Sequence, residues 1–337
     1  ETEGCSTTLR ACPAPSPCTV GVCSPMTGCS VEPAPDGTLC GRDDCLADRV
    51  DLCLSGVCSQ RPRPVTAQCS NRWVPLDEAI GPTAFDVARD RVVLFSDTLG
   101  ATAETWEWDR TSWRQRFPVD APSARSGHAL AYDAARRRVV LFGGSDVTGL
   151  LSDTWEWDGM TWTRRSTVLA PAPRSGHAMT YDPVKRVVVL FGGSPTARAP
   201  LHADTWEWNG REWRERITPN RPQGRIDHGL VYDSNRRRVV LFGGEAEKVI
   251  QGSTFLEPVA QTWELDGTNW VARTLPLEPA PRAHPLLVYD AVRRRVLLRA
   301  GDVRAGVLAP DTWAFDGAGW VKLDDAAAPD DNTDLNA

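Results

Sequence analysis

The sequence predicts an all-β fold built from repeated four-stranded units over residues 70–323, and three observations support this prediction. Two tryptophans seven residues apart recur five times in the 337-residue chain, at positions 106/113, 155/162, 206/213, 263/270 and 313/320. An aromatic-Asp dipeptide recurs with them, starting at Phe85, Tyr132, Tyr181, Tyr232 and Tyr289. A short apolar run, in most units followed by Gly-Gly, lies between these two motifs. Such nearly constant periods are typical of architectures in which each unit packs on its neighbours.

Each unit is expected to contain four strands, and the second unit shows why. A first strand with small residues runs over 125–132 and ends in a polar turn. The continuous apolar run 139–142 predicts a strand covered on both faces, because β-branched and aromatic residues fill it. In Trp155-Glu-Trp157 the two rings point the same way, since side chains alternate along a strand. Asp158-Gly159 predicts a tight turn before the last strand at Trp162.

Large rings can fill the widening space between radially packed sheets, so the units are interpreted as blades of a β-propeller. The aromatic-Asp turn, the Phe-Gly-Gly motif and the spaced tryptophans resemble the kelch repeat, a four-stranded blade of roughly 50 residues. The resemblance covers residues 73–323. The first unit departs from the pattern at Phe95-Ser-Asp, and the fifth departs at Arg299-Ala-Gly. Trp73 resembles the last strand of a further unit. We expect five blades with the Trp73 strand helping to close the ring; the alternative is a sixth, incomplete blade that the Cys-rich segment 1–69 completes.

The segment 1–69 is predicted to form a small disulfide-rich module with too few bulky apolar residues for a core of its own. Ten cysteines lie there, at Cys5, Cys12, Cys18, Cys23, Cys29, Cys40, Cys45, Cys53, Cys58 and Cys69. An even number in a Pro- and Gly-rich segment indicates five internal disulfides, with a connectivity that spacing does not define. A zinc site is the weaker alternative, because the segment has no Cys-x-x-Cys and no histidine.

Cysteine content and charge restrict location and partners. Disulfides predict a secreted, periplasmic or cell-surface protein, or one anchored through an N-terminal segment that has been removed. Residues 70–323 carry a net charge of +2 without a long basic run, so nucleic-acid binding is not expected. No apolar run is long enough for a transmembrane segment. Residues 324–337 hold five Asp and are expected to be a flexible acidic tail.

Four arginines at one repeat position are the first candidates for ligand binding. They are Arg125, Arg174, Arg225 and Arg282, each seven residues before the repeat tyrosine. In kelch-type adaptors, arginines at a similar position face the central channel and bind acidic ligands, which suits the planar guanidinium. The alternative is a structural salt bridge in each unit, with Asp133, Asp182, Asp233 and Asp290 as possible partners.

Catalytic and metal-binding residues are not predicted, so the catalytic, metal and cofactor assignments are none. His128, His177 and His228 share one repeat position, which favours a packing role over a ring of metal ligands. The propeller has no cysteine, which argues against the Tyr–Cys crosslink of copper radical oxidases with a similar fold.

The variable loop of the fourth unit, Glu245–Gln261, is the second candidate for ligand binding. It is the longest of the five variable loops and is apolar, and its candidate contact residues are Val249, Ile250, Phe255 and Leu256. Loops on a rigid scaffold commonly carry binding, although this loop could equally pack on its own blade or on the Cys-rich module. We therefore expect a binding or adhesion scaffold for a protein or glycan partner at the cell surface. The alternatives are an enzyme acting on a sugar or carboxylate at the channel mouth and a structural subunit of a surface assembly; the oligomeric state is not predicted.

Overall fold

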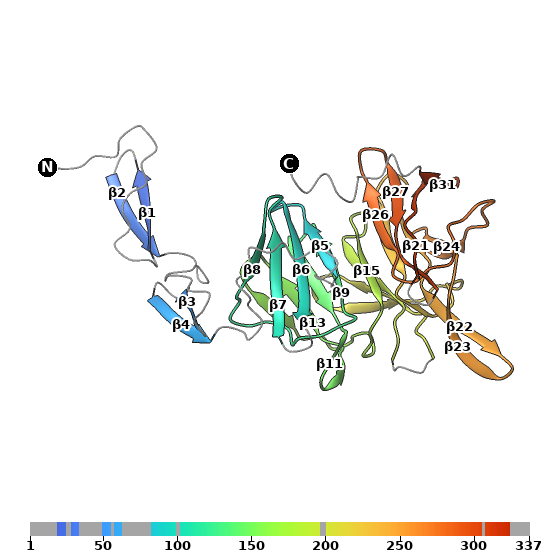
Figure 1. Cartoon of the computed structure of the whole chain (residues 1–337), viewed down its shortest axis with the longest axis horizontal. Coiled ribbons are helices and arrows are strands. Elements are labelled where there is room, and N and C mark those ends of the chain that lie inside the picture. Colours follow the sequence, from blue (N-terminus) through green and yellow to red (C-terminus); the bar gives the residue numbers. More distant parts are fainter. Residues whose placement is uncertain are drawn as a thin grey trace. The chain divides into compact units, whose positions relative to one another are not determined.

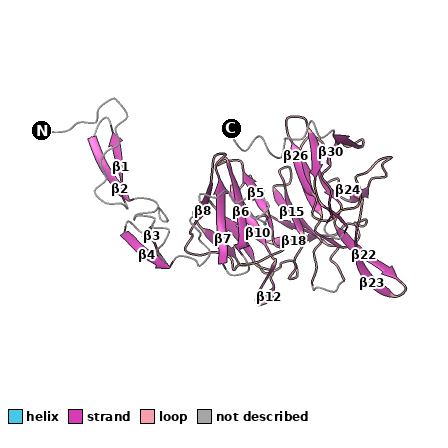
Figure 2. Ribbon diagram, in the orientation of Figure 1, coloured by secondary structure: helices cyan, strands magenta, loops and turns pink. Residues whose placement is uncertain are grey.

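The computed structural model describes residues 19–24, 28–33, 49–54, 57–62, 82–98, 102–195, 200–304 and 307–323. The chain divides into two compact units: the first comprises Glu1–Ile80 with Arg116–Pro118, and the second comprises Gly81–Gln115 with Val119–Ala337. The described part consists of strands and loops and contains no helix (Figure 2). Accordingly, none of the described residues belongs to a helix that could cross a bilayer.

The N-terminal unit contains two antiparallel hairpins. Strand β1 (Thr19–Ser24) pairs with β2 (Gly28–Pro33), and β3 (Arg49–Leu54) pairs with β4 (Val57–Pro62). The register places Cys23 opposite Cys29 and Cys53 opposite Cys58. The remaining cysteines and all cysteine side chains lie outside the described residues, so the five disulfides stay a prediction. Trp73, on which both the ring closure of the five-blade prediction and the six-blade alternative depend, also lies outside them.

The described residues of the second unit form five four-stranded antiparallel sheets of the kind expected for propeller blades, and the total number of blades stays a prediction. Blade 1 comprises β5 (Thr83–Asp86), β6 (Arg91–Thr98), β7 (Thr102–Trp108) and β8 (Trp113–Arg116). Blade 2 comprises β9 (Ala129–Asp133), β10 (Arg138–Phe142), β13 (Thr154–Trp157) and β14 (Trp162–Arg165). Blade 3 comprises β15 (Ala178–Asp182), β16 (Val187–Phe191), β17 (Thr205–Trp208) and β18 (Trp213–Arg216). Blade 4 comprises β20 (Gly229–Asp233), β21 (Arg238–Phe242), β24 (Thr262–Leu265) and β25 (Trp270–Ala272), and blade 5 comprises β26 (Leu286–Asp290), β27 (Arg295–Arg299), β30 (Thr312–Phe315) and β31 (Trp320–Leu323).

The aromatic-Asp turn folds each first hairpin through its own carboxylate. In blade 2, Asp133 Oδ1 accepts the backbone N–H of Arg136 at 3.1 Å, and the Arg136 guanidinium also contacts this carboxylate. The turn ends at Arg137, which adopts a positive φ of 56°. Asp182 and Asp233 accept the equivalent backbone N–H groups at 3.0 Å. These aspartates are therefore required by their own turns.

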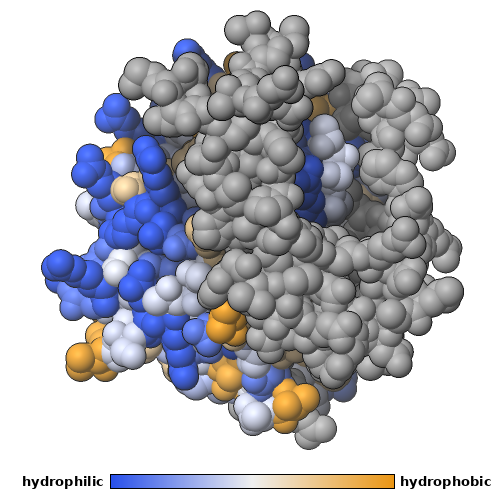
Figure 3. Space-filling view, turned by 90° about the vertical axis from the view of Figure 1, so that its left-hand side faces the viewer, coloured by the Kyte–Doolittle hydropathy of each residue, from blue (hydrophilic) through white to orange (hydrophobic). Residues whose placement is uncertain are grey.

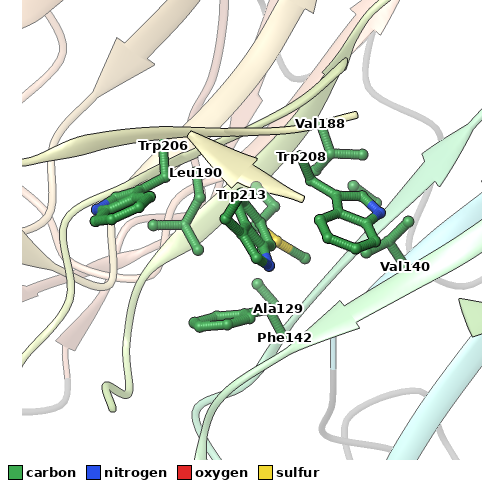
Figure 4. Packing of buried hydrophobic residues seen from close by; sticks show 10 residues of the cluster. Ala129, Val140, Phe142, Val188, Leu190, Trp206, Trp208 and Trp213 are labelled. Carbon is green, nitrogen blue, oxygen red and sulfur yellow. The ribbon is translucent and has the colours of Figure 1, made fainter. Parts of the chain in front are cut away.

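Among the described residues the core consists of four hydrophobic clusters, each formed between two consecutive blades. Figure 4 shows the cluster between blades 2 and 3, where Phe142 and Val140 of one blade pack against Trp208 and Trp213 of the next. Phe142 and Trp213 make a T-shaped contact with centroids 5.0 Å apart. Both rings are fully buried, and such a side chain contributes roughly 1.5–3 kcal/mol through burial. Consecutive blades are thus held together by the same aromatic packing that the repeat predicts.

Three further sheets extend from the blade loops. Strand β11 (Ser145–Asp146) pairs with β12 (Gly149–Leu150), and β28 (Asp302–Arg304) pairs with β29 (Val307–Leu308). In blade 4 the loop is longer, and β22 (Glu245–Ile250) and β23 (Ser253–Pro258) form a hairpin whose inner strand pairs with β19 (Arg225–Ile226). Figure 1 shows the hairpin β22–β23 extending away from the blade sheets.

Candidate functional site

The four predicted arginines lie in the interior of the blade array. Their exposed fractions are 1% for Arg125 and 0% for Arg174, Arg225 and Arg282. In blade 3, Arg174 Nη1 and Nη2 donate to the two carboxylate oxygens of Asp204 at 2.7 and 2.8 Å. The guanidinium also donates to the carbonyl oxygens of Ala172 and Gly192. Since fork-to-fork bonds of this kind satisfy most donors of an arginine, the group is held in one orientation.

The same geometry recurs in blades 2 and 5. Arg125 donates to Asp153 at 2.5 and 2.9 Å, and Arg282 donates to Asp311 at 2.7 and 3.3 Å. The partner is the residue immediately before the Thr-Trp dipeptide of the same blade. The structure therefore pairs these arginines with a different set of aspartates from Asp133, Asp182, Asp233 and Asp290, which lie in the first turns. We refer to the four arginines with their partners as the arginine layer.

Blade 4 is the exception in the arginine layer. Arg225 faces Gln261 in place of an aspartate, and Nη2 donates to the amide oxygen at 3.0 Å. Its other acceptors are the carbonyl oxygens of Gln223 and Gly243. Burial lowers the pKa of Arg225 to about 10. Because an arginine with this pKa is still charged at neutral pH, blade 4 contains a buried cation whose side-chain partner is a neutral amide.

The arginine layer is buried and hydrogen-bonded and does not present a free cationic surface. A ligand carboxylate would have to displace Asp153, Asp204 or Asp311 from a buried bidentate pair. The ligand role predicted for the four arginines stays a prediction, and Arg225 is the one of the four whose side-chain partner carries no charge. Asp204 shows the electrostatics of a normal pair: burial raises its pKa, but the hydrogen bond and charge of Arg174 and the indole N–H of Trp206 together lower it below its ordinary value.

The repeat histidines occupy packing positions between blades. His128, His177 and His228 are 5–6% exposed. Each imidazole packs edge-on against a phenylalanine of the preceding blade, with ring centroids 5.4–5.5 Å apart; these phenylalanines are Phe95, Phe142 and Phe191. Burial, with the nearby arginine charge, lowers the pKa of His128 and His228 to about 3. These rings are thus neutral at physiological pH. In the described part of the chain, no group of three or more His, Cys, Asp or Glu side chains is arranged to hold a metal ion.

The hairpin β22–β23 presents the apolar residues predicted for the fourth loop. Val249 is 69% exposed, Ile250 41%, Phe255 51% and Leu256 40%. Val249 and Leu256 lie on one face of the hairpin, whereas Ile250 and Phe255 lie on the other, because the register pairs Glu247 with Leu256 and Ile250 with Ser253. The loop therefore does not bury these side chains on its own blade.

Two residues that the repeat analysis did not select come together beside this hairpin. Asp227 and His284 occupy the position of Gly127 and Gly176 in blades 2 and 3, and their backbones continue one hydrogen-bonded series from blade to blade. His284 Nε2 lies 3.5 Å from Asp227 Oδ2. Burial raises the pKa of Asp227, partly offset by His284. The detectable signal was the replacement of a repeat glycine by titratable residues in two adjacent blades.

Comparison with known families agrees with the fold. The KLHDC2/KLHL20/DRC7 Kelch-repeats domain matches residues 88–264, which is just over half of the chain. No curated protein matches the sequence. The four-stranded antiparallel sheets of the described residues, with the repeat motifs at equivalent strand positions, are consistent with blades of a kelch-type β-propeller. The chain belongs to the kelch-repeat family, and this domain indicates a protein-binding scaffold.

Proposed function

We propose that this chain is an extracellular or cell-surface binding protein that recognises a protein partner through the hairpin β22–β23. The observation that carries the proposal is the exposure of four large apolar side chains on a single ordered hairpin. Exposed apolar residues scattered singly over a surface need no explanation, and the described surface in Figure 3 shows this ordinary pattern, mostly hydrophilic with isolated hydrophobic residues. A concentrated apolar hairpin instead indicates an interaction site.

The base of the hairpin is fixed to the blades. The backbone carbonyl of Glu247 accepts a hydrogen bond from Gln223 Nε2 at 2.7 Å, and its side chain accepts the backbone N–H of Leu201 at 2.9 Å. Ala246, which is 3% exposed, pairs with the buried Arg225. A surface that is ordered before binding loses less conformational entropy on association, so anchoring of this kind favours affinity.

The outer strand supplies the second element of recognition. β23 is at the edge of its sheet and has no further strand beside it among the described residues. An extended segment of a partner can add to such an edge through backbone hydrogen bonds, while its alternate side chains contact the apolar pairs on either face. This arrangement favours a protein segment with alternating hydrophobic residues over a glycan, which offers neither the backbone nor the apolar side chains.

The cellular location rests on the cysteine content of the N-terminal module. Ten cysteines between Cys5 and Cys69 support an oxidising compartment, since disulfide-dense modules persist outside the cytosol. A partner in the same compartment, such as another surface or secreted protein, is therefore the expected ligand. The pair Asp227–His284 lies close to Glu245, the first residue of the hairpin, and supplies polar groups at the base of the hairpin.

The test uses the full chain, a displayed random-peptide library and a glycan array. We expect enrichment of extended peptides with alternating hydrophobic residues, and loss of their binding in Phe255→Asp. Val147→Asp is the matched control. Val147 is 95% exposed and directly follows β11, in the blade 2 loop that corresponds to the hairpin β22–β23. If the enriched peptides bind Phe255→Asp as tightly as the unmodified chain, the hairpin is not the site. Binding to glycans alone would indicate that the ligand is a carbohydrate and not a protein.

A further inference from the structure

A repeated hydrogen bond joins each pair of consecutive blades. The indole N–H of the tryptophan that starts a fourth strand donates to the threonine before the Trp-x-Trp strand of the preceding blade. The bonds are Trp162 to Thr105, Trp213 to Thr154, Trp270 to Thr205 and Trp320 to Thr262, at 2.8–2.9 Å. Each blade therefore has a donor face, which carries the tryptophan, and an acceptor face, which carries the threonine.

The series is incomplete at both ends of the array. Thr312 of blade 5 is 8% exposed, and its buried hydroxyl has no hydrogen-bond partner among the described residues. Trp113 of blade 1 is only half-buried, whereas its four equivalents are 0–3% exposed. Its indole N–H makes none of the hydrogen bonds found for those equivalents within the described part of the chain. Within that part, blade 5 thus ends on an unpaired acceptor, and blade 1 begins with an unpaired donor.

The apolar residues of these two end faces are also uncovered. Phe85 on the donor face of blade 1 is 49% exposed. Leu286 and Val288 on the acceptor face of blade 5 are 57% and 43% exposed, although the equivalent Ala129 and Ala131 of blade 2 are 5–6% exposed. The four hydrophobic clusters join blades 1 to 5 in sequence, and no cluster of described residues joins blade 5 to blade 1.

Arg299 is the main chemical difference on the acceptor face of blade 5. It occupies the position of Phe95, Phe142, Phe191 and Phe242, whose rings lie 5.0–5.6 Å from the tryptophan of the next blade. A guanidinium plane also stacks favourably on an indole, so an arginine at this position is compatible with a neighbouring tryptophan.

We propose that blade 5 of one copy binds blade 1 of a second copy of this chain, head to tail, so that Trp113 donates to Thr312. The contact repeats the packing of the four interfaces inside the array and satisfies one unpaired group on each face. A pairing of two donor faces would leave Thr312 buried without a partner, which is costly. Because the two faces differ, the association is heterologous and produces either a closed ring or a longer array.

The test compares two full-length variants with one altered face each. Phe85→Asp alters the donor face and Val288→Asp alters the acceptor face, and sedimentation velocity over increasing concentration measures association. We expect the unmodified chain to associate and each variant to associate at least about thirtyfold more weakly, as for residues that dominate an interface. An equimolar mixture of the two variants retains one unaltered interface and is expected to form a dimer that does not grow. Val292→Asp, at an 88% exposed turn position, is the control and is expected to associate normally.

Two milder variants test the hydrogen bond itself. Trp113→Phe removes the indole N–H but keeps an aromatic ring, and Thr312→Val removes the hydroxyl; each is expected to weaken association about fivefold. A chain that stays monomeric at all concentrations overturns the proposal. So does a mixture of the two face variants that fails to dimerise, or an acceptor-face variant that still associates alone, which would indicate pairing of two donor faces. Unchanged association in both milder variants would refute the claim that the hydrogen bond from Trp113 to Thr312 contributes to association.

Discussion

Substitutions in the arginine layer are expected to change stability in opposite directions in two adjacent blades. Asp204→Asn in blade 3 leaves the fully buried Arg174 without a carboxylate, whereas Gln261→Asp in blade 4 gives Arg225 the carboxylate found in three other blades. The first change is expected to lower the melting temperature and the second to raise it.

The magnitudes follow from the contacts. Removing one partner of a buried ion pair costs about 3–5 kcal/mol, and asparagine keeps one acceptor, so we expect about 3 kcal/mol for Asp204→Asn. In a domain of this size 1 kcal/mol corresponds to about 2–4 °C, which gives a loss of about 6–12 °C. A charged hydrogen bond is roughly twice as strong as a neutral one, so Gln261→Asp is expected to add about 1 kcal/mol.

The pH dependence identifies the cause. The pKa of Asp204 is lowered in the folded state, so its contribution to the free energy of unfolding is present above the ordinary carboxyl pKa and is lost as pH falls through the folded-state pKa. Circular-dichroism melts at pH 7 should therefore show the full effect of Asp204→Asn, and melts in acid a smaller one.

Glu212→Gln is the matched control. Glu212 pairs with Arg214 on the surface of the same blade, with side chains 48% and 71% exposed, and such pairs contribute about 0–1 kcal/mol. If Asp204→Asn shifts the melting temperature no more than this control, the arginines are held by backbone carbonyls alone. The structural interpretation of the layer would then be refuted.

Three further outcomes are expected. Trp213→Phe loses the indole bond to Thr154 and part of a fully buried ring, and should cost about 2–4 kcal/mol in the free energy of unfolding, measured in urea. Asp227→Asn should raise the melting temperature at pH 7, because burial raises the pKa of Asp227 and the charged carboxylate therefore destabilises the folded state. The gain should vanish well below pH 4, where the aspartate is protonated in both the folded and the unfolded state. A gain in melting temperature that persists there would contradict this cause. A chain beginning at Asn71 should melt cooperatively in reducing buffer, since every residue of the four clusters lies between Ala84 and Trp320; failure to fold would favour completion of a blade by the N-terminal module.

The blade architecture was predictable because each repeat element has a local cause. The Asp of the aromatic-Asp turn caps its own hairpin, and Gly144 adopts a φ of 92° where an added Cβ would meet Ser126 O at 2.7 Å. Such constraints act over a few residues and are visible in any one unit. The interior apolar strands follow in the same way from their composition.

The partners of the arginines were not predictable from proximity in the sequence. Arg174 and Asp204 are far apart along the chain and meet only after the blade has folded. The turn aspartates were nearer in the sequence, but their carboxylates are already used by backbone N–H groups. A repeat alignment of the residue before each Thr-Trp, which is Asp153, Asp204, Gln261 and Asp311, carries the missing signal.

Three departures from the repeat occur together in blade 4. Its arginine is buried against a neutral amide, Asp227 with a φ of 52° replaces a glycine, and its loop forms the hairpin β22–β23 with exposed apolar residues. Each feature costs stability relative to blades 2 and 3, which keep Asp, Gly and short loops at these positions. Costly exceptions in an otherwise regular scaffold are expected where binding requires them. Blade 4 with the adjacent His284 is therefore the part of the propeller whose local chemistry is least explained by folding and best explained by recognition.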